Sequence, residues 1–181
     1  MMLNRFYNRG MDEAILASKY STCLSTHYGN ALLDPLTGSV VAVGHNGAPK
    51  GKEHCTDIGW CLKKELGYDH FQNGVNNWGG LISCRCSHSD VNVIIQAGLR
   101  AKDCIMFLYG ERNGTPIVPQ PCFSCVKLII NAGIKEVIIR PKTKFISIDP
   151  SKLYDSYVEE LYAQMKDPEI KKVKGKKNVT Q

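Results

Sequence analysis

The sequence predicts a three-layer α/β domain, and three observations support this fold class. Helical patterns alternate with short apolar runs in the second half of the chain, which is typical of a sheet with parallel strands. In the first half, a turn composition at residues 34–38 (DPLTG) separates two apolar runs and predicts a β-hairpin. The 181 residues are 43% hydrophobic and 22% charged, which is ordinary for one globular domain.

The first half begins with a predicted helix inside residues 1–22, with Ile15, Leu16 and Tyr20 on its buried face. The strands of the hairpin are expected at 30–33 and 39–43. Residues 50–87 then contain Gly, Asn and Cys without a sustained period. Such a stretch is too long for a bare loop in a compact domain, so we expect metal ligation to hold it.

Two amphipathic helices with the same internal phasing are predicted in the second half, each with an apolar stripe on one side. The stripes are Val91, Ile94, Ile95 and Leu99 in one helix, and Val126, Ile129, Ile130 and Gly133 in the other. Apolar runs at 104–109 and 136–140 follow these helices and have the length of strands. A last helix is expected over about 151–165.

The positive charge of the chain is concentrated at its end. Lys and Arg exceed Asp and Glu by 23 − 17 = 6, and residues 166–181 hold six Lys against one Asp and one Glu. We therefore interpret 1–165 as a single domain and 166–181 as a basic, disordered tail, with contact to nucleic acid as the alternative for the tail. The rest of the chain is nearly neutral, which makes a nucleic-acid substrate an unfavoured hypothesis.

The eight cysteines are the compositional feature that calls for explanation. No stretch approaches the roughly 20 apolar residues of a membrane span, and the opening MMLNRFYNRG lacks the apolar core of a secretory signal. The expectation is a cytoplasmic protein with no membrane contact and with reduced thiols. Reduced cysteines in a chain of this kind indicate metal or catalytic chemistry before disulfides.

The sharpest local pattern is 121–125 (PCFSC), which opens the second amphipathic helix. Free N–H groups and the dipole at a helix start favour thiolates, so Cys122 and Cys125 suit Zn²⁺ or redox chemistry, and a lone CxxC can also be coincidental. The start of the other helix favours zinc, because His88 lies there, two residues before Asp90.

His88, Cys122 and Cys125 make three protein ligands, the number typical of a catalytic zinc whose fourth position is left for water. A neutral imidazole and two thiolates cancel the charge of the ion, so a bound water can become a hydroxide nucleophile near neutral pH. Asp90 is the acid that the sequence places at this point. It would take the water's proton and pass it to a leaving amine, as general base and general acid in one residue.

These residues resemble a known signature. His88–Asp90 followed by Pro121, Cys122 and Cys125 is similar to the H-x-E…P-C-x-x-C pattern of zinc nucleobase deaminases. Flanking segments narrow the resemblance to the deoxycytidylate (dCMP) deaminase family, over roughly residues 14–139. They are 22–23 (TC), 43–49 (VGHNGAP), 54–55 (HC), 59–61 (GWC), 92–97 (NVIIQA) and 127–135 (KLIINAGIK).

The resemblance implies a cytidine-deaminase-like α/β/α sandwich with a central mixed sheet. It implies hydrolytic loss of ammonia from C4 of the cytosine in dCMP, giving dUMP, and assembly as a homo-oligomer. It also assigns Asn46, Ser89 and Gln120 to the binding of a small-molecule nucleotide. A second, structural zinc is implied at Cys23, Cys55, Cys61 and Cys84, with Cys86 as a substitute ligand; free buried thiols are the alternative.

The sequence departs from the family at three points. Asp90 stands in place of the usual Glu and is one methylene shorter, which withdraws the carboxylate by about 1.5 Å when proton transfer needs hydrogen-bond distance. The cation that usually follows the cysteine at position 23 is missing, and Lys50, Lys52 and His27 are the candidates to replace it. The segment 110–120 (GERNGTPIVPQ) is longer than its family counterpart and leads into the two cysteine ligands.

Two other functions therefore stand beside a dCMP deaminase. An enzyme of the same fold could act on another amino-heterocycle or nucleotide, which the altered acid and the longer segment favour. A catalytically impaired deaminase-like protein could instead use the zinc to hold a nucleotide or a partner.

Overall fold

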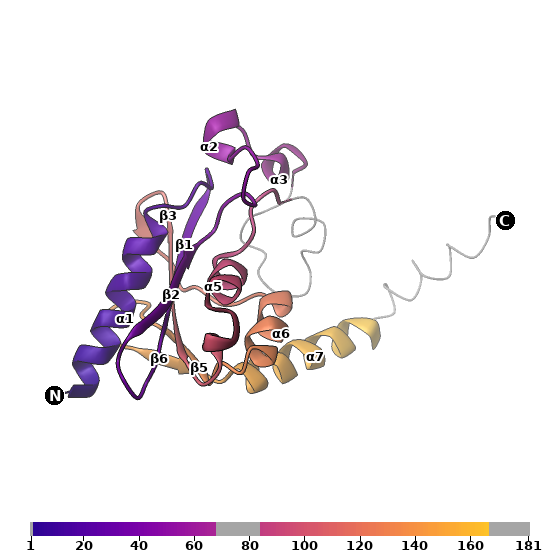
Figure 1. The fold of residues 1–181 in the computed structure, drawn as a ribbon. Coiled ribbons are helices and arrows are strands. Elements are labelled where there is room, and N and C mark those ends of the chain that lie inside the picture. Colours follow the sequence, from indigo (N-terminus) through magenta and orange to yellow (C-terminus); the bar gives the residue numbers. More distant parts are fainter. Residues whose placement is uncertain (1, 68–83, 167–181) are drawn as a thin grey trace.

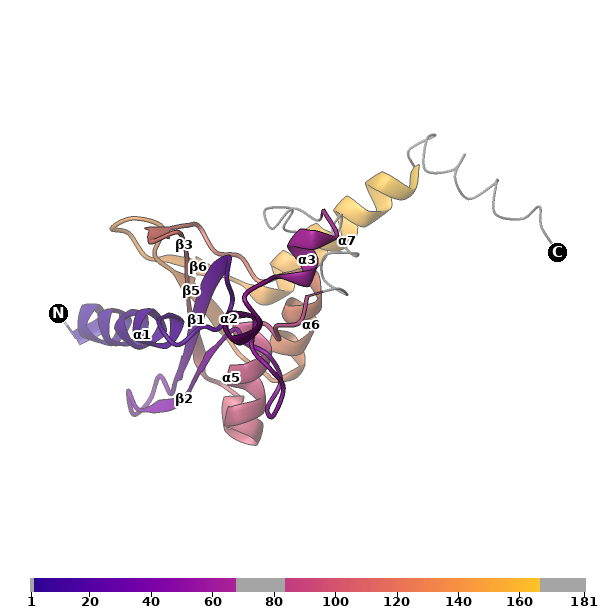
Figure 2. The ribbon, with the colours of Figure 1, turned by 90° about the horizontal axis from the view of Figure 1, so that it is seen from above.

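A six-stranded sheet lies between two layers of helices in the computed structural model, which describes residues 2–67 and 84–166 (Figures 1 and 2). Helix α1 (Met2–Ser18) covers one face of the sheet. Helices α5 (Ser89–Ala97) and α6 (Phe123–Asn131) lie on the other face, and α7 (Pro150–Lys166) packs against α6. The predicted three-layer α/β/α sandwich is confirmed.

The sheet has the order β2-β1-β3-β5-β6, and the short β4 pairs with β3. The strands are β1 (Thr26–Leu33), β2 (Val40–His45), β3 (Ile105–Arg112), β4 (Thr115–Pro116), β5 (Glu136–Ile139) and β6 (Ile146–Ile148). β1 and β2 form the predicted antiparallel hairpin, and β3 and β5 are parallel as predicted. The antiparallel edge strand β6 was not predicted, because three residues are too few to establish an alternating pattern.

The long segment between β2 and α5 contains the short helices α2 (Cys55–Ile58) and α3 (Leu62–Glu65). The predicted zinc-tied loop at 50–87 is described only at its two ends, because residues 68–83 lie outside the described part of the chain. The predicted tail also lies outside it from residue 167 onward. None of the helices in the described ranges is both long and apolar enough to cross a bilayer.

The face of α1 that packs on the sheet differs from the prediction. Met11 and Ala14 are fully buried and Ile15 packs against the same cluster as predicted, whereas Leu16 is exposed and Tyr20 is exposed beyond the end of the helix. The reason is a close approach: a Cβ added to Gly29 on β1 would lie 2.0 Å from the backbone oxygen of Ala14. At this point the helix meets the sheet through its backbone and small side chains, which carry little weight in a hydrophobic pattern, while Phe6, Tyr7 and Met11 pack around Phe107 of β3.

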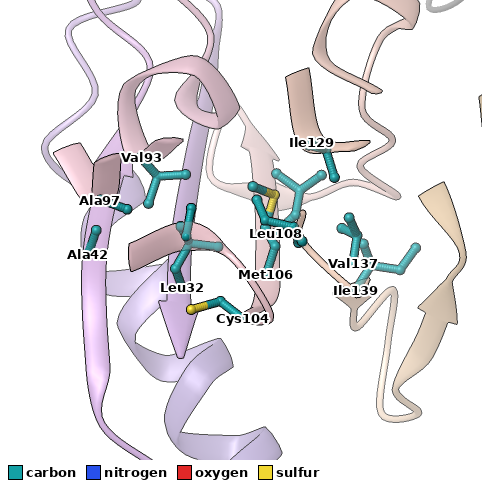
Figure 3. Close-up of a cluster of buried hydrophobic side chains, with 12 residues drawn as sticks. Leu32, Ala42, Val93, Ala97, Cys104, Met106, Leu108, Ile129, Val137 and Ile139 are labelled. Atoms are coloured by element: carbon teal, nitrogen blue, oxygen red, sulfur yellow. The ribbon is translucent and has the colours of Figure 1, made fainter. Parts of the chain in front are cut away.

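The core on the opposite face contains residues from α5, α6 and four strands (Figure 3). Val126 and Ile129 of α6 are fully buried as predicted. The stripe predicted for α5 is wrong in part: Ile94 packs against the core as predicted and Val93 is fully buried, while Ile95 is 73% exposed and Leu99, in the 3-10 turn η1 (Gly98–Ala101), is 99% exposed. A Cβ on Gly44 of β2 would lie 2.7 Å from the backbone nitrogen of Val93, so this contact decides which side of α5 faces the sheet.

Residues 110–120, which the resemblance predicts to be longer than their family counterpart, include the hairpin that joins β3 and β4. Its turn residues Asn113 and Gly114 have φ values of 49° and 74°, the left-handed conformation that a two-residue hairpin turn requires. Asn-Gly is a strong hairpin signal, so the sequence carried the information for this element. The hairpin stands directly before the start of α6.

Candidate functional site

The two helix starts that carry the predicted ligands lie side by side on one face of the sheet. His88 is the N-cap residue of α5 and Cys122 is the N-cap residue of α6, and both have extended backbone conformations. Cys125 lies in the first turn of α6 and is buried. Because both helices begin at the same end of this layer, their free N–H groups and positive dipole ends converge on one point.

His88, Cys122 and Cys125 come together at that point. Nδ1 of His88 lies 3.5 Å from Sγ of Cys122 and 3.4 Å from Sγ of Cys125, and the three ligand atoms all lie within 4.8 Å of one another. Usual zinc bond lengths in a tetrahedral site place a nitrogen and a sulfur ligand about 3.6 Å apart. The donor types and their spacing therefore fit a zinc ion held by Nδ1 and two sulfurs.

The charges of the three groups also favour a cation. Contacts with Cys125 and His88 lower the pKa of Cys122 to about 4, although burial opposes the change. The contact with Cys122 raises the pKa of His88 to about 9. The pKa of Cys125 is raised, first by its contact with Cys122 and then by burial. In the metal-free protein, therefore, a thiolate at Cys122 is stabilised by its neighbours' protons, which a metal ion would replace.

Asp90 lies beside this cluster, in the first turn of α5. Its side chain is almost completely buried and contacts Cys125, and burial raises the pKa of its carboxyl group. Nδ2 of Asn30 donates a hydrogen bond to Oδ1 of Asp90 at 2.8 Å, which opposes that rise. The structure thus places the predicted proton carrier next to the candidate metal ligands and in a low-dielectric environment.

Asn30 is a site residue that the sequence reasoning missed. It lies in the middle of β1, is fully buried, and also accepts a hydrogen bond from the Ser89 hydroxyl at 3.3 Å. A polar residue inside the apolar run of a strand was the available signal. Tyr28, two residues earlier on the same face of the strand, is also near the site: burial and the charge of Asp90 contribute to raising its pKa to about 12.

The other cysteines gather beside the end of α1. Cys23, Cys55 and Cys86 form one buried cluster, and Cys84 packs against it. The sulfurs of Cys55 and Cys86 are 3.8 Å apart, the spacing of two thiolates on a tetrahedral zinc, which is about 3.8 Å. Contacts with Cys86 lower the pKa of Cys23 to about 5 and that of Cys84 to about 6.

Cys86, the substitute ligand in the prediction, therefore lies at the centre of this group. The pKa of its own thiol is raised by the contacts with Cys23 and Cys84. Cys61, at the start of α3, is buried and close enough to Cys55 for its charge to raise the pKa of that thiol. Cys104 is buried in the core below Leu32, where its thiol donates to the backbone oxygen of Arg100 at 3.1 Å.

The three predicted substrate-binding residues all have partners within the chain. Oδ1 of Asn46 accepts from the hydroxyl of Ser21 at 2.6 Å and from the backbone N–H of Tyr28 at 2.8 Å, so Asn46 joins the end of β2 to β1. Ser89 is buried and donates to Asn30. Gln120 is exposed and its amide donates to the hydroxyl of Tyr157 at 3.1 Å.

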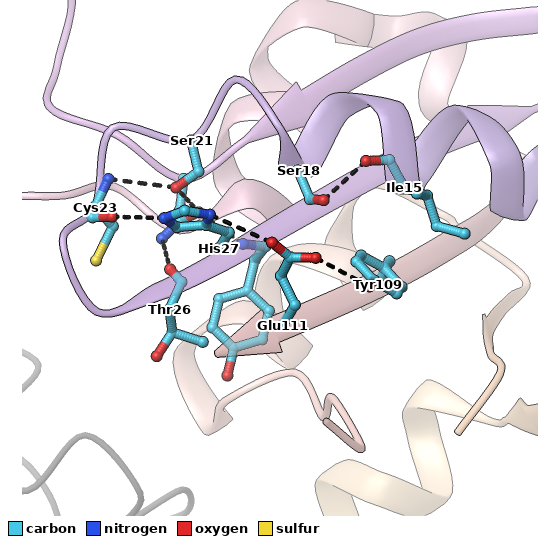
Figure 4. Close-up of polar contacts among 10 residues, drawn as sticks. Ile15, Ser18, Ser21, Cys23, Thr26, His27, Tyr109 and Glu111 are labelled. Carbon is cyan, nitrogen blue, oxygen red and sulfur yellow. Dashed lines mark hydrogen bonds and ion pairs between the residues drawn. The ribbon is translucent and has the colours of Figure 1, made fainter. Parts of the chain in front are cut away.

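The candidate replacement cations belong to two different segments, β1 and the residues after β2. His27 lies next to Glu111, with Nδ1 and Oε1 3.6 Å apart, and its Nε2 is 2.9 Å from the backbone oxygen of Cys23 (Figure 4). Strand alternation places His27 on the α1 face, opposite to Asn30. Lys50 and Lys52 lie exposed after β2. Arg112 of β3 was not considered, and its Nε donates to the Thr26 hydroxyl at 3.3 Å.

Comparison with known proteins assigns this arrangement to a family. Residues 5–140 match the family model described as the cytidine and deoxycytidylate deaminase zinc-binding region. The chain belongs to this family. The match covers β1 to β5, α5, α6 and all but the first residues of α1, and therefore includes both helix starts that carry His88, Cys122 and Cys125.

Curated relatives agree with this membership. The chain is 30% identical over 129 residues to a deoxycytidylate deaminase of Schizosaccharomyces pombe, and 27% identical over 128 residues to one of Saccharomyces cerevisiae. Each match covers 71% of this chain and 34% or 35% of the relative. The chain thus spans about a third of the length of the curated relatives that it matches.

Solved structures share the fold. A dCMP deaminase from the cyanophage S-TIM5, crystallised with dCMP and dUMP, superposes with a TM-score of 0.54 at 20% identity, covering 84% of this chain and 92% of that one. A cytidine deaminase from Burkholderia pseudomallei gives a TM-score of 0.50 at 15% identity, covering 81% and 94%. The predicted cytidine-deaminase-like fold is therefore confirmed.

Proposed function

We propose that this chain is a zinc-dependent hydrolytic deaminase of a cytosine nucleotide that converts dCMP to dUMP. The observation that carries the proposal is the meeting of His88, Cys122 and Cys125 at tetrahedral spacing, with the buried Asp90 beside them. Membership of the family supports the reaction class. The names of the curated relatives and the nucleotides bound to the phage enzyme support dCMP as the substrate.

In this reaction water adds to C4 of the cytosine ring, and the exocyclic amine leaves as ammonia. Zinc, when held by His88, Cys122 and Cys125, supplies a Lewis acid that makes water acidic enough to lose a proton near neutral pH. Asp90 would accept that proton and deliver it to ring nitrogen N3, then pass the remaining proton of the C4 hydroxyl to the amine; the two protons of water thus end on N3 and on the ammonia that leaves. The buried position of Asp90 raises its pKa, which makes it a better proton acceptor than an exposed aspartate.

A metal assay and an activity assay test the proposal together. Purified protein is expected to contain zinc and to release ammonia from dCMP, with CMP and dCTP as comparison substrates. Cys125→Ala is expected to lose one zinc per chain and the activity. Cys104→Ala is the matched control, because Cys104 is also a buried thiol but lies in the core away from both clusters. Absence of both zinc and turnover in the unchanged protein would refute the assignment.

We further propose a structural zinc at the second cysteine cluster, with Cys23, Cys55, Cys84 and Cys86 as its ligands. The sulfur spacing of Cys55 and Cys86 supports it, together with the contacts of Cys86 to the other two, although among the described residues only His88, Cys122 and Cys125 have ligand atoms that all lie within 4.8 Å of one another, so zinc would have to draw these four sulfurs closer together. Four thiolates close the coordination shell, so this ion would have no open position for water. Cys86→Ala should remove one zinc while Cys61→Ala retains it; the reverse result would restore Cys61 as the ligand.

A second candidate function has an observation of its own. The hairpin of β3 and β4 stands before Cys122, in the segment that the resemblance predicts to be longer than its family counterpart, and a longer segment there would change which ring enters the site. Ammonia release from a panel of amino-purines, pterins and modified cytidines, with none from dCMP, would identify a deaminase of another amino-heterocycle. Zinc and nucleotide binding without turnover of any of these compounds would identify a binding protein.

We also propose that the chain forms a homo-oligomer. Light scattering would measure the mass of the assembly.

A further inference from the structure

Asn30 is the one fully buried asparagine side chain in the described part of the sheet, and it lies under the active site. Its neighbours in register are Gly44 on β2 and Leu108 on β3, so it occupies the centre of the sheet. An amide at such a position is stable only when its polar atoms have partners. Nδ2 contacts Oδ1 of Asp90 at 2.8 Å and Sδ of Met106 at 3.4 Å, and Oδ1 accepts from Ser89.

These contacts connect a strand and a helix that are distant in the sequence. Asn30 belongs to β1, whereas Ser89 and Asp90 form the first turn of α5. Because one amide bonds both residues of that turn, it fixes the helix start against the sheet. It also holds one carboxylate oxygen of Asp90, which sets the rotation of the carboxylate and therefore the direction of its second oxygen.

We propose that Asn30 is a positioning residue that aims the short Asp90 carboxylate at the metal position, so that residues 30 and 90 work as a size-matched pair. This inference rests on the proposed deaminase function. Nδ2 of Asn30 lies 2.8 Å from Oδ1 of Asp90, which leaves no room for another atom between the amide and the carboxylate. A longer acid at position 90 would collide with it, and a smaller residue 30 would leave Asp90 free to rotate.

The pairing predicts an unusual pattern in a double-variant cycle. Asn30→Ala should lower kcat by about 10- to 100-fold with little change in KM, because a misplacement of about 1 Å at a reacting group costs this much. Asp90→Glu alone should also lower kcat, since the extra methylene meets the amide of Asn30. In the double variant, the smaller side chain at position 30 leaves room for the longer acid at position 90. Its kcat should therefore be at least tenfold higher than that of Asp90→Glu alone. Losses that multiply in the double variant would overturn the proposal.

The same cycle can be measured without turnover, on the metal-free protein. Each single variant should lower the urea midpoint of unfolding, and the double variant should recover at least half of the loss of Asp90→Glu. Additive losses would overturn the pairing whether or not the chain deaminates dCMP. If the unchanged protein instead holds zinc but turns over no substrate, the proposed function fails while this cycle still decides the role of Asn30.

Met106→Leu is the matched control. It removes the other contact of the Asn30 amide, the sulfur at 3.4 Å, with a side chain of similar volume, and leaves the contact with Asp90. Its kcat and zinc content should stay within about twofold of the unchanged protein. A loss equal to that of Asn30→Ala would mean that general packing around Asn30, rather than the aim of Asp90, determines the rate, and would overturn the proposal.

Discussion

At the scale of single residues, the site combines groups whose protons are strongly coupled. Cys122 is held as a thiolate by its contacts with Cys125 and His88, while the same contacts raise the pKa values of Cys125 and His88. Asp90 contributes a fourth titratable group to the same small, buried volume. In the metal-free protein the protonated His88 offsets the charge of the Cys122 thiolate, and a metal ion bound there would replace that proton.

Asp90→Asn tests the role of the carboxylate. The amide keeps the shape of Asp90 but cannot accept the proton of the attacking water, so kcat should fall by about 10²- to 10⁴-fold. Zinc content, measured by atomic emission, should not change, because Asp90 is not one of the three ligands. Asp103→Asn is the control, as Asp103 is a surface residue paired with Lys135. Unchanged turnover in Asp90→Asn would exclude Asp90 as the proton carrier.

At the scale of elements, the close packing of α5 on β2 positions His88 and Asp90. Gly44 permits it, because a Cβ there would lie 2.7 Å from the backbone nitrogen of Val93. Gly44→Ala should therefore push the helix away, lower the free energy of unfolding by about 1–3 kcal/mol and reduce turnover. Urea unfolding measures the first effect. Adding Val93→Ala should give no rescue, since the nearest atom belongs to the backbone; full rescue would contradict this account.

Helix α7 supports the segment that leads into α6. The hydroxyl of Tyr157 donates to the backbone oxygen of Pro121 at 2.8 Å and accepts from the amide of Gln120. Tyr157→Phe should lower the free energy of unfolding by about 1 kcal/mol at pH 7. Because Pro121 directly precedes Cys122, loss of this hydrogen bond should also displace Cys122 and weaken the binding of zinc. An unaltered urea midpoint would mean that this hydrogen bond does not stabilise the fold.

The same tyrosine predicts a pH dependence. Burial raises the pKa of Tyr157 to about 12, above its ordinary value of 10 in the unfolded chain. The unfolded state therefore ionises first, and stability that is complete below pH 10 is lost as the pH rises through 12. Tyr157→Phe should lose less stability than the unchanged protein between pH 10 and 12. Tyr28, whose pKa is also raised by burial and by the charge of Asp90, is present in both proteins, so the difference between them reports on Tyr157.

At the scale of the whole molecule, the two cysteine-containing clusters join segments that are distant in the chain. One brings together the starts of α5 and α6, and the other connects the end of α1 with α2 and the segment before α5. Zinc at these points would bind the folded state alone and stabilise it by mass action. At a free zinc concentration 100 times the dissociation constant, one site contributes about 2.7 kcal/mol.

Removal of zinc by a chelator should therefore lower the unfolding temperature, and added Zn²⁺ should restore it. Mg²⁺ should not, because thiolate and imidazole ligands select zinc over hard cations. Calorimetry of the unchanged protein and of Cys86→Ala separates the contributions of the two clusters. An unfolding temperature that does not respond to the chelator in either protein would contradict a structural role for the metal.

Much of the architecture could be predicted from local patterns. The turn at 34–38 gave the β1–β2 hairpin, and the alternation after residue 89 gave the parallel pairing of β3 and β5. The faces of α1 and α5 could be predicted only in part, because Gly29 and Gly44 decide them by letting backbone atoms approach closely. Hydrophobic periodicity is calculated from large apolar side chains, so it does not detect a close contact that depends on a glycine.

The sequence by itself determined the family, the donor types and the two helix starts that bear them, because ligand chemistry and helix-start signals are local properties. Only the tertiary structure decided which atoms meet. It turned Nδ1 of His88 towards both sulfurs, placed Cys86 at the centre of the second cluster, and put Asn30 against Asp90 across 60 residues of chain. These contacts depend on how β1 packs against α5, and a local sequence pattern does not encode the packing of two elements that are distant in the chain.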